Sequence, residues 1–554
     1  MTSILHHPLL GPIKGLNVTP LLTQFRALPY AHISQRFARS VLADRLPTSS
    51  SNTPFDATQE GPSSIQPWNS AQTDASGNQL PTSNIPEGCG DYQSEDCLHL
   101  TITVSKDTPS NARLPVLLFL HGGAFFLGAS TRPYYYPLTF LTQAVTSSHP
   151  LVFVALNYRL GALGFFHSPE ASDLVPPNNG LHDQLRAFEW VRRHIGGFGG
   201  DADNVTAMGQ SAGGESLSLH NISGNEMELY RRCVMFSGSP VTMPCKTPRE
   251  HQENFLDMAA KLEIETDGRE SRDIAEDMIK ADVDKIRKLG FVGAPCSSSE
   301  VLPYEKPTML LTRRRTPAKW LEKQLVSAAE YDGGISYNML LNDDSREGHA
   351  ASFARITRDV LKEPQALLDL YEIKEEDEDE MTLRKICQLE SDIGFFAAAL
   401  SVAMGASQAD SLDQLGKSSG SSHPITYMQL FGLGNPFDGP LPKNEYATHT
   451  WDIVALLGAY EDQLETKTKE IVRSWRARII EFAAGKDPWE QWTLEDGKAL
   501  VVRNEGDTIQ TSDEYLGPKS RRRRLLEIAR NEGGDDGWDL LWESVCRRWL
   551  MKGE

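Results

Sequence analysis

The chain has 554 residues, of which 40% are hydrophobic and 23% charged, as in ordinary folded proteins. Its formal net charge of −20 argues against nucleic acid or an anionic membrane as the main partner. With seven cysteines at least one thiol must stay free, and no run of about 18 apolar residues suggests a membrane span. The N-terminus lacks the basic and apolar regions of a signal peptide, which predicts a cytosolic protein.

The first ninety residues contain little continuous apolar sequence. Residues 8–45 include Gly11 and Gly15 among short extended stretches, which predicts a small β-meander at one edge of a sheet. Residues 46–91 are rich in Ser, Thr, Asn, Pro and Gly, and so long a loop in a compact protein is usually a lid, a binding loop or disordered. Residues 98–104 alternate apolar and polar side chains and are predicted to form a strand.

The middle of the chain alternates between strands and helices. Short apolar runs bounded by glycine or polar residues are predicted to be strands buried on both faces, at residues 114–120, 151–156, 205–208 and 232–238. Residues 178–195 place apolar side chains at steps of three and four, which predicts a helix. Such alternation favours a mostly parallel sheet with helices on both faces.

The second half of the chain is less regular. A charged, helical region at 247–325 is followed by predicted strands and helices, the strands at 335–341 and 424–431 and the helices at 451–460 and 466–484. The sequence shows no repeats and no clean linker. We therefore expect residues 1–554 to form one large α/β domain with helical insertions.

A C-terminal helical extension is predicted over residues 505–554. Its Trp538, Trp542 and Trp549 lie on one face of an amphipathic helix. We expect this face to pack either on the body of the protein or on a partner chain in a homodimer.

The most informative stretch is Gly209-Gln210-Ser211-Ala212-Gly213, which follows the predicted strand at 205–208 and opens a helix. Gly-x-Ser-x-Gly between a strand and a helix is the pattern of a nucleophile elbow. The glycines let strand and helix pack closely around a sharp turn, which leaves the serine hydroxyl exposed. Ser211 is therefore the predicted nucleophile.

Four further motifs occur in a fixed order and resemble the type-B carboxylesterases, the cholinesterase and lipase family of α/β-hydrolases, especially fungal intracellular members. These motifs are Ser94-Glu95-Asp96-Cys97-Leu98, His121-Gly122-Gly123-Ala124-Phe125, Asn157-Tyr158-Arg159-Leu160-Gly161, and Phe198-Gly199-Gly200-Asp201 running into the elbow. The resemblance covers roughly residues 10–480 and implies an α/β-hydrolase fold.

The resemblance also implies a catalytic triad in the chain order serine, acid, histidine. Glu347, followed by Gly348, matches the acid, and His449 matches the base. In that chemistry the histidine takes the serine proton, and the carboxylate orients the imidazole. The same region holds rival candidates: Asp343 and Asp344 for the acid, and His349 and His423 as further histidines.

An oxyanion hole needs backbone N–H groups that converge from two loops. By the resemblance these groups belong to Gly123, Ala124 and Ala212. Ala124 stands where the family usually has a third glycine. Its methyl group matters if the position requires a positive φ or a close approach of the substrate.

The expected substrate is a small apolar or aromatic ester. The candidate pocket residues flank the oxyanion and nucleophile motifs or belong to an aromatic pair further along the chain: Gly122, Phe125, Phe126, Gln210, Phe395 and Phe396. No metal-ligand spacing and no phosphate-binding loop is present in the sequence, so no metal or other cofactor is expected.

The cysteines depart from secreted relatives, which close a long N-terminal loop with a disulfide at the Ser-Glu-Asp-Cys motif. Here the only upstream cysteine is Cys89, so a bridge to Cys97 could close only a short loop, and a reducing cytosol disfavours it. The predicted activity is hydrolysis of carboxylic esters. Two competing hypotheses are acyl transfer with the same serine and a catalytically silent binding module.

Overall fold

The computed structural model describes residues 1–47, 53–291, 294–343, 345–346, 348–407 and 423–552. In this described part, one sheet of 13 strands runs through the molecule. Its N-terminal edge is an antiparallel meander of β1 (Thr2–His7), β2 (Gly11–Asn17) and β3 (Leu22–Pro29). The predicted meander is thus confirmed.

The meander joins the main sheet through β7 (His99–Ser105), which pairs antiparallel with both β3 and β9 (Val152–Leu156). From β9 onward the order is β8 (Leu114–Leu120), β10 (Gly200–Gln210) and β11 (Arg232–Phe236), all parallel. Their buried residues are apolar on both faces, because helices cover both faces of a parallel sheet. These strands confirm the predicted ones.

Residues 46–91, predicted to be a loop, contain more structure than expected in their described part. They include the short strand β6 (Phe55–Ala57), which pairs with β2, and the helix α1 (Ser70–Gly77). Ser70 and Ala71 are completely buried. One face of this helix is therefore buried against the rest of the protein, and the opposite face, with Thr73 and Ser76, is exposed.

One predicted strand is wrong. Residues 335–341 lie in helix α10 (Gly334–Leu340), and the strand at this point of the sheet is β12 (Lys323–Ala329), which begins within the region predicted to be helical. β12 pairs with β11 on one side and with β13 (Ile425–Gly432) on the other. The apolar run at 335–341 therefore has no free strand edge to pair with, and it folds as a helix with one buried face.

After β13 the sheet ends in β14 (Ala499–Arg503) and the antiparallel β15 (Gly506–Gln510). Helices α15 (Trp451–Leu457) and α16 (Thr466–Ala483) precede them, as predicted. The sheet thus brings the carboxyl ends of β8, β10, β11, β12 and β13 to one edge. Functional loops of open α/β sheets gather at this edge.

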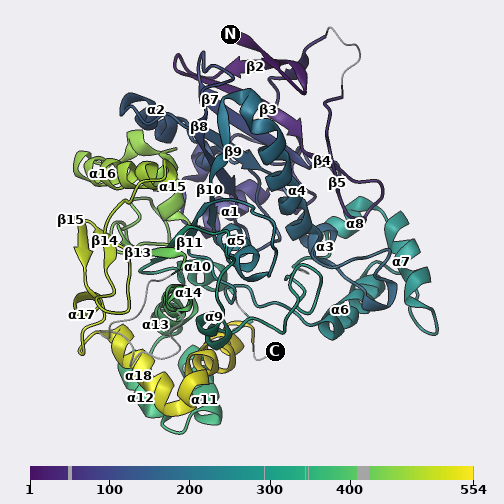
Figure 1. Ribbon diagram of the computed structural model, residues 1–554. Helices are drawn as coiled ribbons and strands as arrows, with labels where there is room; N and C mark the ends of the chain where they lie inside the picture. Colours follow the sequence, from purple (N-terminus) through teal and green to yellow (C-terminus); the bar gives the residue numbers. More distant parts are fainter. Residues whose placement is uncertain (48–52, 292–293, 344, 347, 408–422, 553–554) are drawn as a thin grey trace.

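A long apolar helix crosses the lower part of the molecule in Figure 1. It consists of α13 (Asp379–Glu390), a π-helical segment η5 (Ser391–Ala397) and α14 (Ala398–Ala406). By length and composition it could cross a membrane, but 94% of its apolar window is buried inside the protein. It is built as a core helix.

The C-terminal extension packs on this core helix. It contains α18 (Arg521–Gly533) and the π-helical segment η9 (Leu540–Arg547). A side chain at Gly394 in η5 would meet the ring of Trp542 at 2.5 Å, so the two π-helical segments touch. Trp538, Trp542 and Trp549 are 2–3% exposed, which agrees with packing on the body of the protein.

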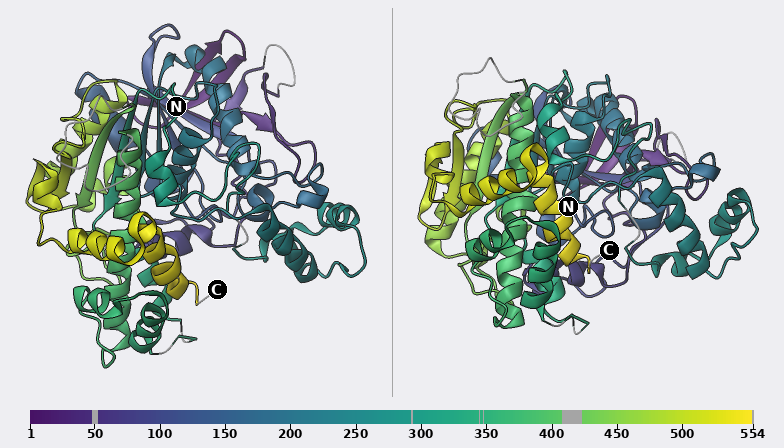
Figure 2. Two further views of the ribbon diagram at one scale, coloured as in Figure 1. Left: turned by 60° about the horizontal axis from the view of Figure 1, so that its bottom comes forward. Right: turned by 90° about the horizontal axis from the view of Figure 1, so that it is seen from below.

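Three helices project to one side of the body: α6 (Pro248–Lys261), α7 (Ser271–Lys280) and α8 (Val283–Arg287). Figures 1 and 2 show them standing out in each view. They pack on the body through a small apolar cluster, in which Phe255, Ile274 and Met278 of these helices lie together with Phe37 and Phe166 of the body.

Candidate active site

Ser211 lies on a sharp turn between β10 and helix α5 (Ala212–Ile222), with φ 54° and ψ −126°. A side chain at Gly209 would meet the backbone of Gly213 at 2.3 Å, and one at Gly213 would meet the Leu120 carbonyl at 2.2 Å. Both glycines are therefore required by close backbone approach. Ser211 makes no side-chain capping bond to α5, so its hydroxyl is not used by the helix.

The loop after β8 lies directly beside this turn, because Gly209 pairs with Leu120 in the parallel ladder of β10 and β8. A side chain on Gly122 would come within 2.9 Å of Ser211 Cβ. The backbone then adopts positive φ at Gly123 (106°), Ala124 (53°) and Phe125 (57°). Three consecutive residues in this region form a strained loop, which favours a functional role.

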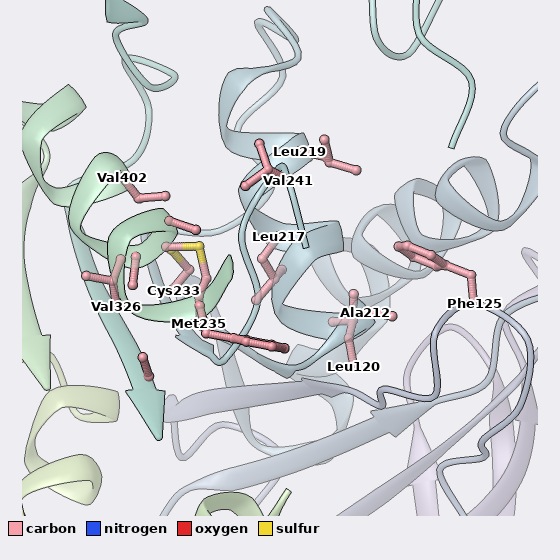
Figure 3. Packing of buried hydrophobic residues seen from close by; sticks show 14 of the residues in the cluster. Leu120, Phe125, Ala212, Leu217, Leu219, Cys233, Met235, Val241, Val326 and Val402 are labelled. Carbon is pink, nitrogen blue, oxygen red and sulfur yellow. The ribbon is translucent and has the colours of Figure 1, made fainter. Parts of the chain in front are cut away.

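The expected oxyanion amides are unused within the described residues. The N–H groups of Gly123, Ala124 and Ala212 donate no hydrogen bond there. Instead the Gly123 carbonyl accepts bonds from the two N–H groups that close the loop, at 2.9 Å each. Ala212 begins α5 and packs with Leu120 and Leu217 (Figure 3), so its amide sits at a helix N-terminus, where negative charge is stabilised.

Ala124 has a positive φ, which is one of the two conditions under which its methyl group was expected to affect the site. Alanine is disfavoured in this region by about 1–2 kcal/mol relative to a relaxed backbone. The surrounding loop must compensate that cost.

A buried glutamine holds the far end of the oxyanion loop. The amide of Gln66 donates to the carbonyl of Gly128 at 2.9 Å and accepts from its N–H at 2.9 Å. Gly128 has φ 115°, and a side chain there would meet the Gly122 carbonyl at 2.5 Å. Arg132 donates to the same Gln66 oxygen, and Arg287 from α8 donates to the Gln66 carbonyl. The loop is thus fastened to α8 through one residue.

His449 is brought to the site by the loop that follows β13. A parallel bridge joins Tyr331 to Thr448, and the N–H of Tyr331 donates to the carbonyl of Ala447 at 3.1 Å. Asp332 and His449, the next residue on each strand of that bridge, then meet. The distance from His449 Nδ1 to Asp332 Oδ1 is 2.7 Å.

The carboxylate in this contact is not the one predicted from the sequence. Glu347 lies outside the described residues, and so does its rival Asp344. The carboxylate at Nδ1 of His449 belongs to Asp332, which follows β12 directly. The prediction placed the acid after residues 335–341, most of which form helix α10, whereas the strand at this point of the sheet ends at Ala329, 12 residues before residue 341.

The three remaining candidates for the acid and the base make their contacts away from His449. Asp343 bonds Ser345 and Arg346 on an exposed loop. His349 begins helix α11 (His349–Val360) and contacts Asp379. His423 is exposed and precedes β13.

Asp332 is completely buried and held at both oxygens. Its Oδ2 accepts from Ser237 Oγ at 3.0 Å and from the N–H of Ala329 at 2.7 Å, which leaves Oδ1 for the histidine. Burial alone would lower the pKa of His449. The hydrogen bond and charge of Asp332, with the charges of Asp452 and Glu390, outweigh burial and raise that pKa above 6.5.

Further carboxyl groups surround this pair. Burial raises the pKa of Glu390 to about 7, although Ser336 donates a hydrogen bond of 2.8 Å to it. Burial also raises the pKa of Asp452, on α15, to about 7. Burial likewise raises the pKa of Asp74 on α1, partly offset by the charges of Arg132 and His449. Two of the acids near the histidine, Glu390 and Asp452, therefore titrate near neutral pH.

The candidate pocket residues divide into two groups. Gln210 and Phe395 contact His449: Gln210 Nε2 lies 3.1 Å from His449 Nε2, and the Phe395 ring centroid lies 5.4 Å from the imidazole. Phe126 is half-buried and packs edge-on against the exposed Phe291. Gln210 and Phe395 therefore contact the histidine, and Gly122 lies beside Ser211. Phe126 follows the oxyanion loop, and among the described residues its ring contacts Phe291 and not the histidine.

Phe125 and Phe396 are instead built into the core. Phe125 is completely buried and packs on Phe165 with ring centroids 4.6 Å apart. Phe396 is completely buried, and the Arg522 guanidinium lies 4.4 Å from its ring centroid. Both rings therefore serve packing, and the prediction of a pocket role for them is not supported by these contacts.

The seven cysteines are free thiols, so Cys89 and Cys97 form no bridge. Burial raises the pKa of Cys97 to about 12. Within the described residues, no three His, Cys, Asp or Glu side chains are arranged to hold a metal ion.

The sequence reasoning missed two residues that the geometry puts at the site, Asp332 and Gln66. For Asp332 a signal was present, because Asp332-Gly333 comes three residues after the end of the mostly apolar stretch at 325–329. No local pattern identified Gln66, whose partner Gly128 is 62 residues away in the chain.

Comparisons with known proteins agree with this geometry. The family model described as "Carboxylesterase family" matches residues 2–514. Para-nitrobenzyl esterase of Bacillus subtilis (strain 168) is 38% identical over 195 residues, which are 35% of this chain and 38% of the relative. An inactive carboxylesterase-like protein of Byssochlamys spectabilis, VdtD, is 31% identical over 241 residues, 41% of either chain. The matched stretches thus span about two fifths of these two curated relatives.

A solved structure of PNB esterase superimposes with a TM-score of 0.71 at 22% identity and covers 95% of this chain and 99% of its own. That likeness shows the predicted fold, an α/β-hydrolase with a large, mostly parallel sheet. The chain belongs to the carboxylesterase family.

Proposed function

We propose that this chain hydrolyses small carboxylic esters through an acyl-enzyme on Ser211. The observation that carries the proposal is the 2.7 Å contact between His449 Nδ1 and Asp332 Oδ1 at the sheet edge that also carries the elbow. A carboxylate at Nδ1 fixes the tautomer in which Nε2 carries no proton and can accept one. The unused amides beside Ser211 supply the second requirement, donors for a developing oxyanion.

The proposed reaction has two halves. Ser211 Oγ attacks the ester carbonyl carbon while its proton passes to His449 Nε2, and the C–O bond breaks as that proton moves to the departing alcohol. Water then gives a proton to Nε2 and attacks the acyl carbon, which releases the acid and restores the serine. The amides of Gly123, Ala124 and Ala212 stabilise the negative oxygen in both halves.

The substrate we propose is small and apolar near the scissile bond. Phe126, Phe291 and Phe395 present aromatic surface around the oxyanion loop and the histidine. Apolar walls with a few placed polar groups are usual for such pockets. The cytosolic location stays a prediction.

Labelling with a fluorophosphonate, followed by mass mapping, tests the nucleophile. We expect a single adduct on Ser211 that is absent from Ser211→Ala, and turnover of short p-nitrophenyl esters that Ser211→Ala lacks. The similarity to an inactive relative makes a silent binding module the competing hypothesis. Absence of both labelling and turnover in the folded protein would favour that module, and an adduct on another serine would overturn the assignment.

Acyl transfer is tested in the same assay. Addition of an alcohol that accelerates acyl-enzyme breakdown well beyond the rate in water would favour transfer over hydrolysis.

A further inference from the structure

The side-chain amide of Gln210 contacts Nε2 of His449, the ring nitrogen that takes the proton in the proposed reaction. The residue directly precedes Ser211, is 1% exposed, and its Nε2 lies 3.1 Å from Nε2 of His449. Since Nδ1 of that ring is bonded to Asp332, the neutral histidine carries its proton on Nδ1. Its Nε2 is then an acceptor, and the Gln210 amide donates to it.

We infer that Gln210 is a positioning residue that holds the His449 ring beside Ser211 in both of its protonation states. The inference rests on the proposed function. An amide carries a donor and an acceptor on one group. Turned by half a rotation about its last bond, Gln210 presents Oε1 to an imidazolium whose Nε2 now donates.

The surroundings hold the amide close to the ring and to the elbow. A side chain on Gly122 would meet Gln210 Oε1 and the Gln210 carbonyl, both at 2.7 Å. The glycine of the oxyanion loop thus leaves the space that the amide fills. Gln210 therefore spans from the oxyanion loop to the base, and its position depends on the same backbone as Ser211.

A neutral amide at position 210 adds no negative charge to the surroundings of His449, which already contain carboxyl groups from several elements. Asp332 comes from the loop after β12, Glu390 from α13, Asp452 from α15 and Asp74 from α1. Phe395 covers another side of the ring with an apolar surface. Gln210 is the neutral polar contact, at Nε2. A carboxylate in its place could not donate to the neutral ring and would favour the imidazolium.

The test compares Gln210→Glu and Gln210→Met with the unchanged protein across the pH profile of kcat/KM. For Gln210→Glu we expect the acid limb to move up by about one pH unit, as for a new carboxylate within contact distance of a titrating group. For Gln210→Met we expect the plateau of kcat to fall about 10-fold without an upward shift of the limb. A merely structural role would lower kcat in both variants without moving the acid limb in Gln210→Glu.

Gln184→Glu is the matched control. Gln184 is also completely buried and its Oε1 lies 2.9 Å from a histidine nitrogen, that of His220. The control therefore introduces the same charge beside another histidine, and the acid limb should stay where it is. An equal upward shift in the control would overturn the inference, because the effect would then be one of general charge.

The titration of His449, followed by ¹⁵N NMR of labelled imidazole, gives a readout independent of turnover. An upward shift of the His449 pKa in Gln210→Glu supports the inference even if no ester is hydrolysed, in which case only the proposed function fails. Unchanged titration in that variant overturns the inference, and so does full kcat in Gln210→Met where the unchanged protein is an active esterase.

Discussion

The nucleophile side and the base side of the site are held by different means. Around Ser211 the support is backbone: positive φ over three consecutive loop residues, and glycines at which any side chain would collide within 3 Å. Around His449 the support is a chain of side-chain hydrogen bonds that ends on Asp332 and Ser237. The nucleophile side therefore depends on close backbone packing, and the base side depends on charge and on the positions of protons.

Because the two sides are held differently, substitutions on each side should affect activity in different ways. A substitution on the nucleophile side should act by displacing backbone, with little dependence on pH. A substitution on the base side should change protonation, with little change in shape.

The largest effect is expected for Asp332→Asn. Asparagine keeps the size of the side chain but removes the negative charge at Nδ1, and the loss of the carboxylate in a triad of this kind costs about 10⁴-fold in kcat. The acid limb of kcat/KM should also move to lower pH, because the charge of Asp332 is a main cause of the raised His449 pKa. Stopped-flow hydrolysis of a p-nitrophenyl ester measures both.

Glu347→Gln is the companion variant, since that residue was the acid expected from the sequence. Its kcat should stay near that of the unchanged protein. The reverse result, with Glu347→Gln inactive and Asp332→Asn active, would return the role to Glu347.

Gly123→Ala should have the next largest effect. The added methyl group would meet the Leu127 carbonyl at 2.0 Å, at a φ of 106°, so the loop must shift and misplace an oxyanion amide. Loss of one such donor typically costs about 10²–10³-fold in kcat. The pH profile should keep its shape.

Ala124→Gly, one residue further, is the opposite change at a φ of 53°. Glycine relieves the backbone strain there, and we expect kcat to be retained and the free energy of unfolding to rise by at most about 1 kcal/mol. Equal losses of activity in both variants would mean that side-chain volume, and not backbone position, controls the loop.

The smallest effect concerns stability and Glu390. Its pKa is raised from 4.5 to about 7 by burial, so the folded protein holds this proton where the unfolded chain has lost it. The stability it contributes is fully present below pH 4.5 and is lost as pH rises through about 7. Glutamine cannot ionise, so the stability advantage of Glu390→Gln over the unchanged protein should grow by about 3 kcal/mol between pH 4.5 and pH 8. Urea unfolding at the two pH values measures this difference, and parallel stability curves would contradict it.

The contrast also explains what the sequence could predict. Gly209 to Gly213 and His121 to Phe125 are contiguous, because a loop built from backbone geometry needs its glycines next to one another. The sharp turn at Ser211, the loop after β8 and the adjacent strands were therefore predictable from short motifs. The parallel order of the strands followed from apolar runs that are buried on both faces.

The base side could not be predicted in the same way. The acid is a single carboxyl residue whose role depends on where a strand ends, and β12 has a mixed sequence, Lys-Gln-Leu-Val-Ser-Ala-Ala, without a clear strand pattern. The apolar run at 335–341 has the stronger strand pattern, and the choice of Glu347 followed from it. Pairing with β11 and β13 decides the strand, and such pairing is a property of the whole sheet.

Phe395, which packs beside His449, belongs to a segment that is held by residues near the C-terminus, and these are synthesised last. Phe395 lies in η5, whose Asp392 receives hydrogen bonds from Arg521 at 2.6 Å and Arg522 at 3.0 Å, 129 and 130 residues later in the chain. Trp542 then packs on Gly394. While the ribosome is still translating those last helices, a nascent chain already holds Ser211, Asp332 and His449 but lacks the braces of η5. Maturation of the site therefore waits for the final stretch of polypeptide to emerge and dock.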